Sequence, residues 1–171
     1  LRDEKTSREG VLVDLETRQL EVRLISGDVI KSGIRWLLKE PLWIVGDFFR
    51  IIKENLFSPS HLIKCVFVFL KSSAVVDLVE REKVDLVHVF WGHYPAIIIP
   101  YLRKSIPMIP ITVFLGAYSL RYRIPSGPRV IRAADTVLTH FDGHVSEITE
   151  FLGKVCPPIE VIYRGTETTL H

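Results

Sequence analysis

The sequence predicts an α/β domain with a doubly wound parallel sheet and helices on both faces. From residue 84 to residue 163, short apolar segments alternate with amphipathic ones, which is the order of βαβ units. The short segments are nearly continuous in Val, Ile and Leu, as in parallel strands that are buried on both faces. The 171 residues suffice for one domain with a full core, so a single domain is expected over 1–171.

The expected elements follow one another in a regular order. We expect an irregular charged segment at 1–19 and a first strand at 20–25. Residues 32–55 place apolar side chains at three- and four-residue steps, which predicts helix, and Pro41 divides this segment in two because proline lacks a backbone donor. Strands are then predicted at 84–90, 109–115, 136–140 and 159–163, and helices at 61–83, 95–104, 128–134 and 144–152.

Composition excludes several classes of protein. A content of 47% hydrophobic and 25% charged residues is ordinary for a folded domain, and a net charge of +2 gives no strong field for nucleic acid, which is not an expected partner. Cys65 and Cys156 lack C-x-x-C spacing, which argues against a zinc site and a disulfide framework. There is no signal-peptide pattern after Leu1 and no run of about 18 uncharged apolar residues, so we expect a cytoplasmic location.

Residues 32–57 leave two interpretations open. Trp36 and Trp43 occur there among basic residues, which is typical of an amphipathic helix lying on anionic lipid. This interpretation adds peripheral contact with the inner face of a membrane. The other interpretation is a helix whose apolar side faces the core and whose basic side is solvated. The basic residues concerned are Lys31, Arg35, Lys39, Arg50 and Lys53.

Candidate binding residues follow the predicted strands, because ligands of open parallel sheets bind beyond the carboxyl ends of the strands. After strand 84–90, Gly92 permits close approach of the backbone and His93 can donate a hydrogen bond. Trp91 offers a flat surface for a sugar ring, although core packing is the more frequent use of tryptophan. The later loops supply the further substrate-binding candidates Gly116, Tyr118, Ser119, Arg121, Arg164, Gly165 and Glu167, the two arginines as partners for diphosphates or acidic sugars.

Other motifs give weaker indications. His88 lies within a predicted strand, where a buried core histidine and a functional one fit equally well. Neither G-x-G-x-x-G nor G-x-x-x-x-G-K-[ST] occurs, so neither a dinucleotide site nor a P-loop is indicated. His140 and His144 have a spacing that permits metal binding on one helix, but His140 is expected to end a strand, and no metal site is predicted.

The order of five short motifs carries a resemblance to a known family. They are Asp85–His93 (DLVHVFWGH) followed by Pro95 and Ala96, Ile106–Pro110 (IPMIP), Phe114–Leu120 (FLGAYSL), Ala133–Leu138 (AADTVL) and Val161–Glu167 (VIYRGTE). From 84 to 167, about half of the chain, their order resembles the N-terminal half of retaining glycosyltransferases of the family four type, which have the GT-B fold.

The resemblance implies a Rossmann-like domain, an incomplete half of a GT-B fold, that binds the acceptor while a second domain binds the nucleotide sugar. It implies a first strand upstream of Leu1 and a second domain after Glu167, so this chain alone is expected to be inactive. The implied reaction moves a sugar from a nucleotide-sugar donor to a glycan or lipid-linked acceptor, without a cofactor.

The chain also departs from the family pattern. Phe90 and Gly116 stand where histidines are common, Ser119 where aspartate is usual, and Arg164 where asparagine is common. No catalytic residue is therefore assigned. The alternative hypothesis is a non-enzymatic doubly wound domain that binds a partner or a membrane surface through its amphipathic helices.

Overall fold

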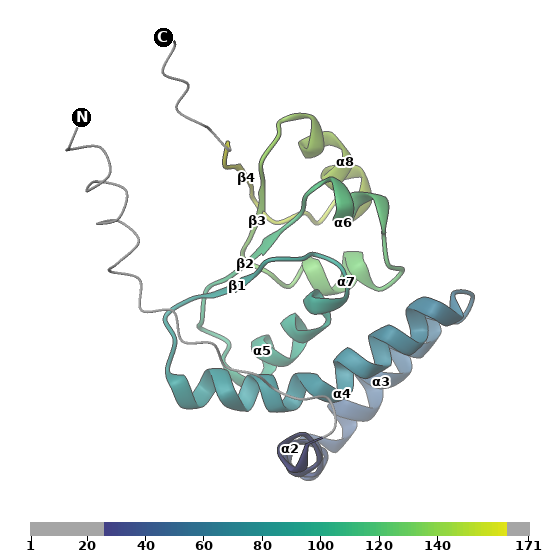
Figure 1. Cartoon of the computed structure of the whole chain (residues 1–171), viewed down its shortest axis with the longest axis vertical. Coiled ribbons are helices and arrows are strands. Elements are labelled where there is room, and N and C mark those ends of the chain that lie inside the picture. The colour runs from purple at the N-terminus through teal and green to yellow at the C-terminus, as the bar shows by residue number, and fades with distance from the viewer. Residues whose placement is uncertain (1–25, 164–171) are drawn as a thin grey trace, which may run out of the picture.

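Four parallel strands form the sheet of the structure, a computed structural model that describes residues 26–163 (Figure 1). In the sheet they lie in the order in which they occur in the chain. The register places Val87 opposite Ile111, and Thr112 opposite Thr136. The predicted α/β class and the predicted parallel strands are thereby confirmed. The strands are β1 (Val87–Val89), β2 (Ile111–Phe114), β3 (Thr136–Thr139) and β4 (Ile159–Val161).

Helices precede the sheet and connect its strands. Ser26 begins the first of them by accepting a hydrogen bond from the Val29 amide, and Pro41 starts the second, so the predicted division at Pro41 is confirmed. The short helix at 117–121 was not predicted. No helix within residues 26–163 is both long enough and apolar enough to cross a membrane. The helices are α2 (Gly27–Lys39), α3 (Pro41–Asn55), α4 (Pro59–Glu82), the 3₁₀ helix η1 (Tyr94–Ile98), α5 (Ile99–Ser105), α6 (Ala117–Arg121), α7 (Gly127–Ile131) and α8 (Gly143–Leu152).

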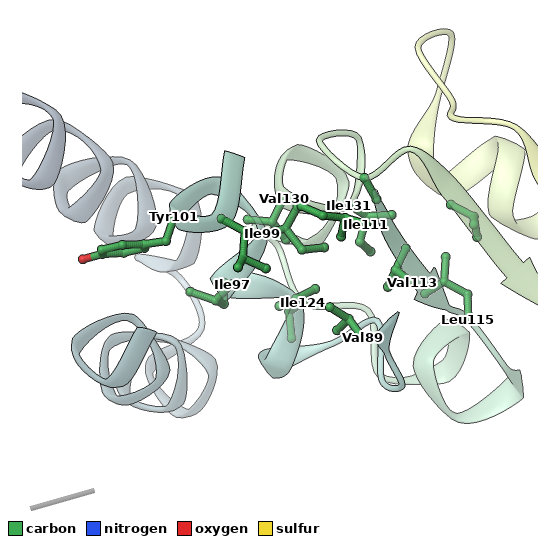
Figure 2. Packing of buried hydrophobic residues seen from close by; sticks show 14 of the residues in the cluster. Val89, Ile97, Ile99, Tyr101, Ile111, Val113, Leu115, Ile124, Val130 and Ile131 are labelled. Atoms are coloured by element: carbon green, nitrogen blue, oxygen red, sulfur yellow. The ribbon is translucent and has the colours of Figure 1, made fainter. Parts of the chain in front are cut away.

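The described helices cover one face of the sheet. Alternate strand residues such as Val89, Val113 and Val137 are buried in one apolar cluster with side chains of α5, α7 and α8, and these helices lie on the same side of the strands (Figures 1 and 2). On the opposite face His88 and Glu160 are exposed. The predicted burial of both faces is therefore not found within the described residues. The strand expected at 20–25, on which a doubly wound arrangement would depend, lies outside them.

An aromatic cluster joins the first helices to the rest of the core. The Tyr101 ring of α5 lies 5.2 Å from the Trp36 ring of α2 and 4.8 Å from the Trp43 ring of α3, measured between centroids. Trp36 is only 3% exposed, and its indole N–H donates to Asp77 of α4. Trp36 is therefore a core residue, and Trp43 is partly buried against the same cluster, as the second interpretation expected. The peripheral membrane contact expected through residues 32–57 stays a prediction.

A buried ion pair joins α7 to α3. Arg129 contacts the Asp47 carboxylate at 2.6 Å and the Glu54 carboxylate at 2.7 Å. Asp47 is 2% exposed, and this burial raises the pKa of its carboxyl group against the opposing effect of the Arg129 charge. Arg129 thus serves the packing of two helices rather than a binding loop.

A second arginine fixes the segments that enter β2 and β3. Arg103 of α5 donates through Nε to the carbonyl of Ala133 at 2.7 Å and through Nη1 to the carbonyl of Ile109 at 2.9 Å. It also pairs with Asp135, whose carboxylate accepts from the Ile111 amide at 2.7 Å. These contacts hold the pKa of the Asp135 carboxyl below its ordinary value.

We predict that Arg103→Ala lowers the free energy of unfolding by about 2 kcal/mol, because it leaves two backbone carbonyls and the Asp135 carboxylate without their donor. Urea unfolding of the purified chain measures the change. Arg81→Ala is the matched control, since Arg81 is exposed and pairs only weakly with its neighbour Glu82, 3.6 Å away. Equal stabilities of the two variants would contradict the assigned role of Arg103.

Candidate functional site

Aromatic side chains from two loops meet at the carboxyl edge of the sheet. Trp91 and His93 follow β1, and Tyr118 follows β2 on α6. The Trp91 and His93 rings are stacked at an interplanar angle of 16°, with centroids 5.6 Å apart. Tyr118 meets both rings edge-on, at 5.6 Å from each. We call these three side chains the aromatic platform. The sequence therefore placed Trp91, His93 and Tyr118 correctly at one edge.

Gly92 allows the two loops to approach each other. Its amide donates to the Phe114 carbonyl at 3.0 Å, which continues the pairing of β1 with β2 beyond the last ladder residues. A Cβ at this position would lie 2.0 Å from Cδ2 of Leu115, which is fully buried. The close approach expected at Gly92 is confirmed, but its partner in the structure is the neighbouring strand rather than a ligand.

His93 is held in one orientation and one tautomer. Its Nδ1 accepts a hydrogen bond from the Tyr94 amide at 2.8 Å, which caps the start of η1. Because Nδ1 acts as an acceptor, the neutral ring carries its proton on Nε2. Burial lowers the pKa of His93 below its ordinary value of 6.5 and so favours this neutral form. The imidazole is thus prepared to donate one hydrogen bond through Nε2.

The loop after β2 adds a buried hydroxyl and an exposed cation. Gly116 is buried and precedes α6, where an added Cβ would lie 3.0 Å from the Phe114 ring and 3.3 Å from the His140 ring. Ser119 is 2% exposed, and its hydroxyl has no hydrogen-bond partner among residues 26–163. Arg121 is exposed in the last turn of α6. The remaining candidates Arg164, Gly165 and Glu167 lie outside the described residues.

Other basic residues near these loops bind the protein itself. Arg123 donates to the Leu120 carbonyl at 3.0 Å and lies over the Phe151 ring. Arg132 donates to the Leu152 carbonyl at 2.6 Å. Neither side chain was chosen as a candidate from the sequence.

Sequence reasoning missed Tyr122 and a row of rings on the partly exposed face of the sheet. The Tyr122 ring lies 4.4 Å from the Tyr118 ring, measured between centroids, at the C-cap of α6, and the four-residue spacing of the two tyrosines was the available signal. On the sheet face, Phe114 stacks between Phe90 at 5.5 Å and His140 at 5.6 Å. Alternation along adjacent strands could have indicated this row.

The histidines of the strands and of α8 take structural positions. His88 is exposed rather than buried, and its Nδ1 lies 2.8 Å from the Thr112 hydroxyl of β2. His144 contacts the Thr139 hydroxyl at 3.1 Å, and its ring meets the His140 ring edge-on. Within the part of the chain that the structure describes, no three His, Cys, Asp or Glu side chains are grouped to hold a metal ion.

A groove runs from the aromatic platform along β1. It has a volume of about 410 Å³ and lies between α4 and β1. Apolar side chains such as Val68, Val75 and Val89 form most of its lining, and Trp91 contributes at the carboxyl end of β1. The exposed Trp91 ring therefore borders both the platform and an apolar space large enough for a small organic group.

Comparison with known proteins gives no relative for this chain. No protein-family model, no curated protein and no solved structure matches it.

We predict that Gly92→Ala disturbs the platform and destabilises the fold by about 1–3 kcal/mol, because the new methyl group would overlap the buried Leu115 side chain. Gly46→Ala in α3 is the control. Its added methyl group meets no atom within 4 Å outside its own helix, so it should be neutral or slightly stabilising. Thermal unfolding of both variants measures the difference, and a neutral Gly92→Ala would show that the two loops are not in close contact.

We predict that His93 makes folding stability depend on pH. The pKa of His93 is lower in the folded than in the unfolded state. Its contribution to the free energy of unfolding is therefore complete above about pH 6.5, and it is lost as the pH falls through the pKa of the folded state. Urea unfolding measures the free energy of unfolding at about pH 8 and about pH 5.5. The decrease between the two pH values should be smaller for His93→Asn than for the unchanged protein, because asparagine keeps an acceptor for the Tyr94 amide but does not titrate. An identical loss in both proteins would contradict this assignment.

Proposed function

We propose that this domain binds the acceptor of a glycosyltransferase that transfers a sugar from a nucleotide-sugar donor to a glycan or lipid-linked acceptor. The observation that supports the proposal most directly is the aromatic platform of Trp91, His93 and Tyr118 at the carboxyl edge of a parallel sheet. This edge is where open α/β sheets bind ligands. Trp91 and Tyr118 are 39% and 52% exposed, so their rings can be reached from solvent.

The chemistry of the platform suits a sugar. The apolar ring faces of Trp91 and Tyr118 can pack against the C–H groups of a pyranose, while polar groups beside them bind its hydroxyls. The neutral His93 ring can donate to such a hydroxyl through Nε2. Arg121, exposed on α6, adds a partner for a phosphate or an acidic sugar.

The resemblance of residues 84–167 to family four type glycosyltransferases supports the same function. In that family a second domain holds the nucleotide sugar, so the present proposal concerns the acceptor side of the reaction. The doubly wound, GT-B type arrangement is part of this proposal. Because Gly116 and Ser119 differ from the usual residues of the family, no catalytic role is assigned to either.

Saccharide binding by the purified chain tests the proposal. We expect members of a panel of mono- and oligosaccharides to shift NMR signals of the Trp91 indole, and Trp91→Ala or Tyr118→Ala to weaken that binding about tenfold. Phe57→Ala is the control, because Phe57 is 95% exposed at the turn between α3 and α4. The proposal fails if no saccharide binds, or if Phe57→Ala weakens binding as much as the platform variants.

A further inference from the structure

Helix α3 turns a row of apolar side chains outward. Leu42, Val45, Phe49 and the C-cap residue Leu56 follow one another at steps of three, four and seven residues, so they lie along one side of the helix. They are 89%, 44%, 61% and 56% exposed. Phe57, in the turn between α3 and α4 that projects from the molecule in Figure 1, is 95% exposed. We call these five side chains the α3 stripe.

The opposite side of α3 supplies its contacts with the core. Asp47, Ile51 and Asn55 are buried there at four-residue steps. Asp47 pairs with Arg129 of α7, and the Asn55 amide donates to the Ser126 hydroxyl at 3.1 Å. These contacts fix the helix from one side and leave the α3 stripe on the other. Single exposed apolar residues are common on soluble domains, but contiguous groups of them mark interaction sites.

The charged side chains beside the α3 stripe are basic. Arg50 and Lys53 are exposed, and at about 100° of rotation per residue both lie along the same border of the stripe. Arg50 acts on the buried Asp47 through its charge alone, because Arg129 holds that carboxylate. Among residues 26–163, the ion pairs that involve α3 use its two acids and neither of these two bases.

The acids nearest to the α3 stripe in the chain are held by other residues. Asp47 and Glu54 pair with the same arginine of α7, and Glu40 pairs with a lysine of α5 at 3.0 Å. Helix α4, which packs beside α3, has no acid before Asp77 in its second half. The charge that α3 presents outward is therefore positive.

From the apolar stripe and its basic border we infer that α3 docks on the surface of an anionic lipid bilayer. A helix that lies at such a surface buries its apolar side among the lipids and places Lys and Arg beside the phosphates. A second copy of the chain is a poorer occupant, because two α3 stripes packed antiparallel about Phe49 would bring Arg50 of one copy next to Arg50 of the other. The inference does not depend on saccharide binding at the aromatic platform.

Co-sedimentation of the whole chain with lipid vesicles tests the inference. The probes are vesicles of phosphatidylcholine alone and vesicles of phosphatidylcholine with phosphatidylglycerol. We expect binding to the anionic vesicles that added salt weakens, and weaker binding to the neutral ones. Phe49→Glu with Phe57→Glu should abolish binding, because both new carboxylates would enter the lipid surface. Arg50→Gln with Lys53→Gln should weaken binding to the anionic vesicles about tenfold.

Two control variants make the same changes elsewhere on the surface. Met108 and Val155 are 89% and 70% exposed in loops next to β2 and β4, so Met108→Glu with Val155→Glu should bind vesicles like the unchanged chain. Lys83 and Lys154 are exposed outside α3, and Lys83→Gln with Lys154→Gln removes the same net charge with little effect on binding. Circular dichroism checks that each variant is folded.

Three outcomes would overturn the inference. The first is absence of vesicle binding, or binding that ignores lipid charge. The second is a control variant that loses as much binding as its counterpart on α3. The third is a dimer of the chain, in place of vesicle binding, that the double glutamate variant of the α3 stripe dissociates. None of these outcomes bears on saccharide binding at the aromatic platform, which is measured separately.

Discussion

The order of the four strands constrains the rest of the described structure. When parallel strands follow one another across a sheet without a reversal, right-handed crossovers carry every connecting helix to the same face. Here β1 to β4 lie in chain order (Figure 1), and α5, α7 and α8 bury one set of strand residues in a single cluster. The same order gathers the loops that follow the strands at one edge, which is where the aromatic platform lies.

The geometry of that edge depends on how closely β1 and β2 approach beyond their last paired residues. Gly92 has no side chain, so its backbone can lie against Leu115 and donate to the Phe114 carbonyl. This contact brings the residues on either side of Gly92 toward Tyr118 of the next loop. A larger residue would separate the loops by moving a fully buried leucine. Packing inside the sheet, rather than direct contact with a ligand, therefore explains why glycine is needed at this position.

Local sequence patterns predicted most helices and strands. They did not predict the short helix at 117–121 or which side of α2 faces the core. Pro41 and the Val- and Ile-rich segments act within a few residues, so the helix boundary and the strands could be predicted from the sequence. Helix 117–121 has only five residues, too few for a periodic signal. The side of α2 that faces the core depends on Asp77, which bonds Trp36 from 41 residues away. No local pattern identifies such a partner, so the sequence left open whether Trp36 faces the core or a membrane.

The candidate site was predictable to a similar extent. The rule that ligands bind beyond parallel strands located Trp91, His93 and Tyr118, because that rule needs only the strand ends. The rule does not show which nearby arginines are engaged within the protein. Arg129 and Arg121 both lie near the predicted loops, but Arg129 pairs with residues 75 and 82 positions earlier in the chain, whereas Arg121 remains exposed. Partners that are so distant in sequence become visible only when α3 and α7 are packed together.

Helix α4 also supports the aromatic platform from the side of the helices that precede the sheet. Near its start, His61 lies within 2.7 Å of the Tyr94 hydroxyl, and the Tyr94 ring contacts His93 of the platform. Helix α4 is thus joined through η1 to the loop that follows β1.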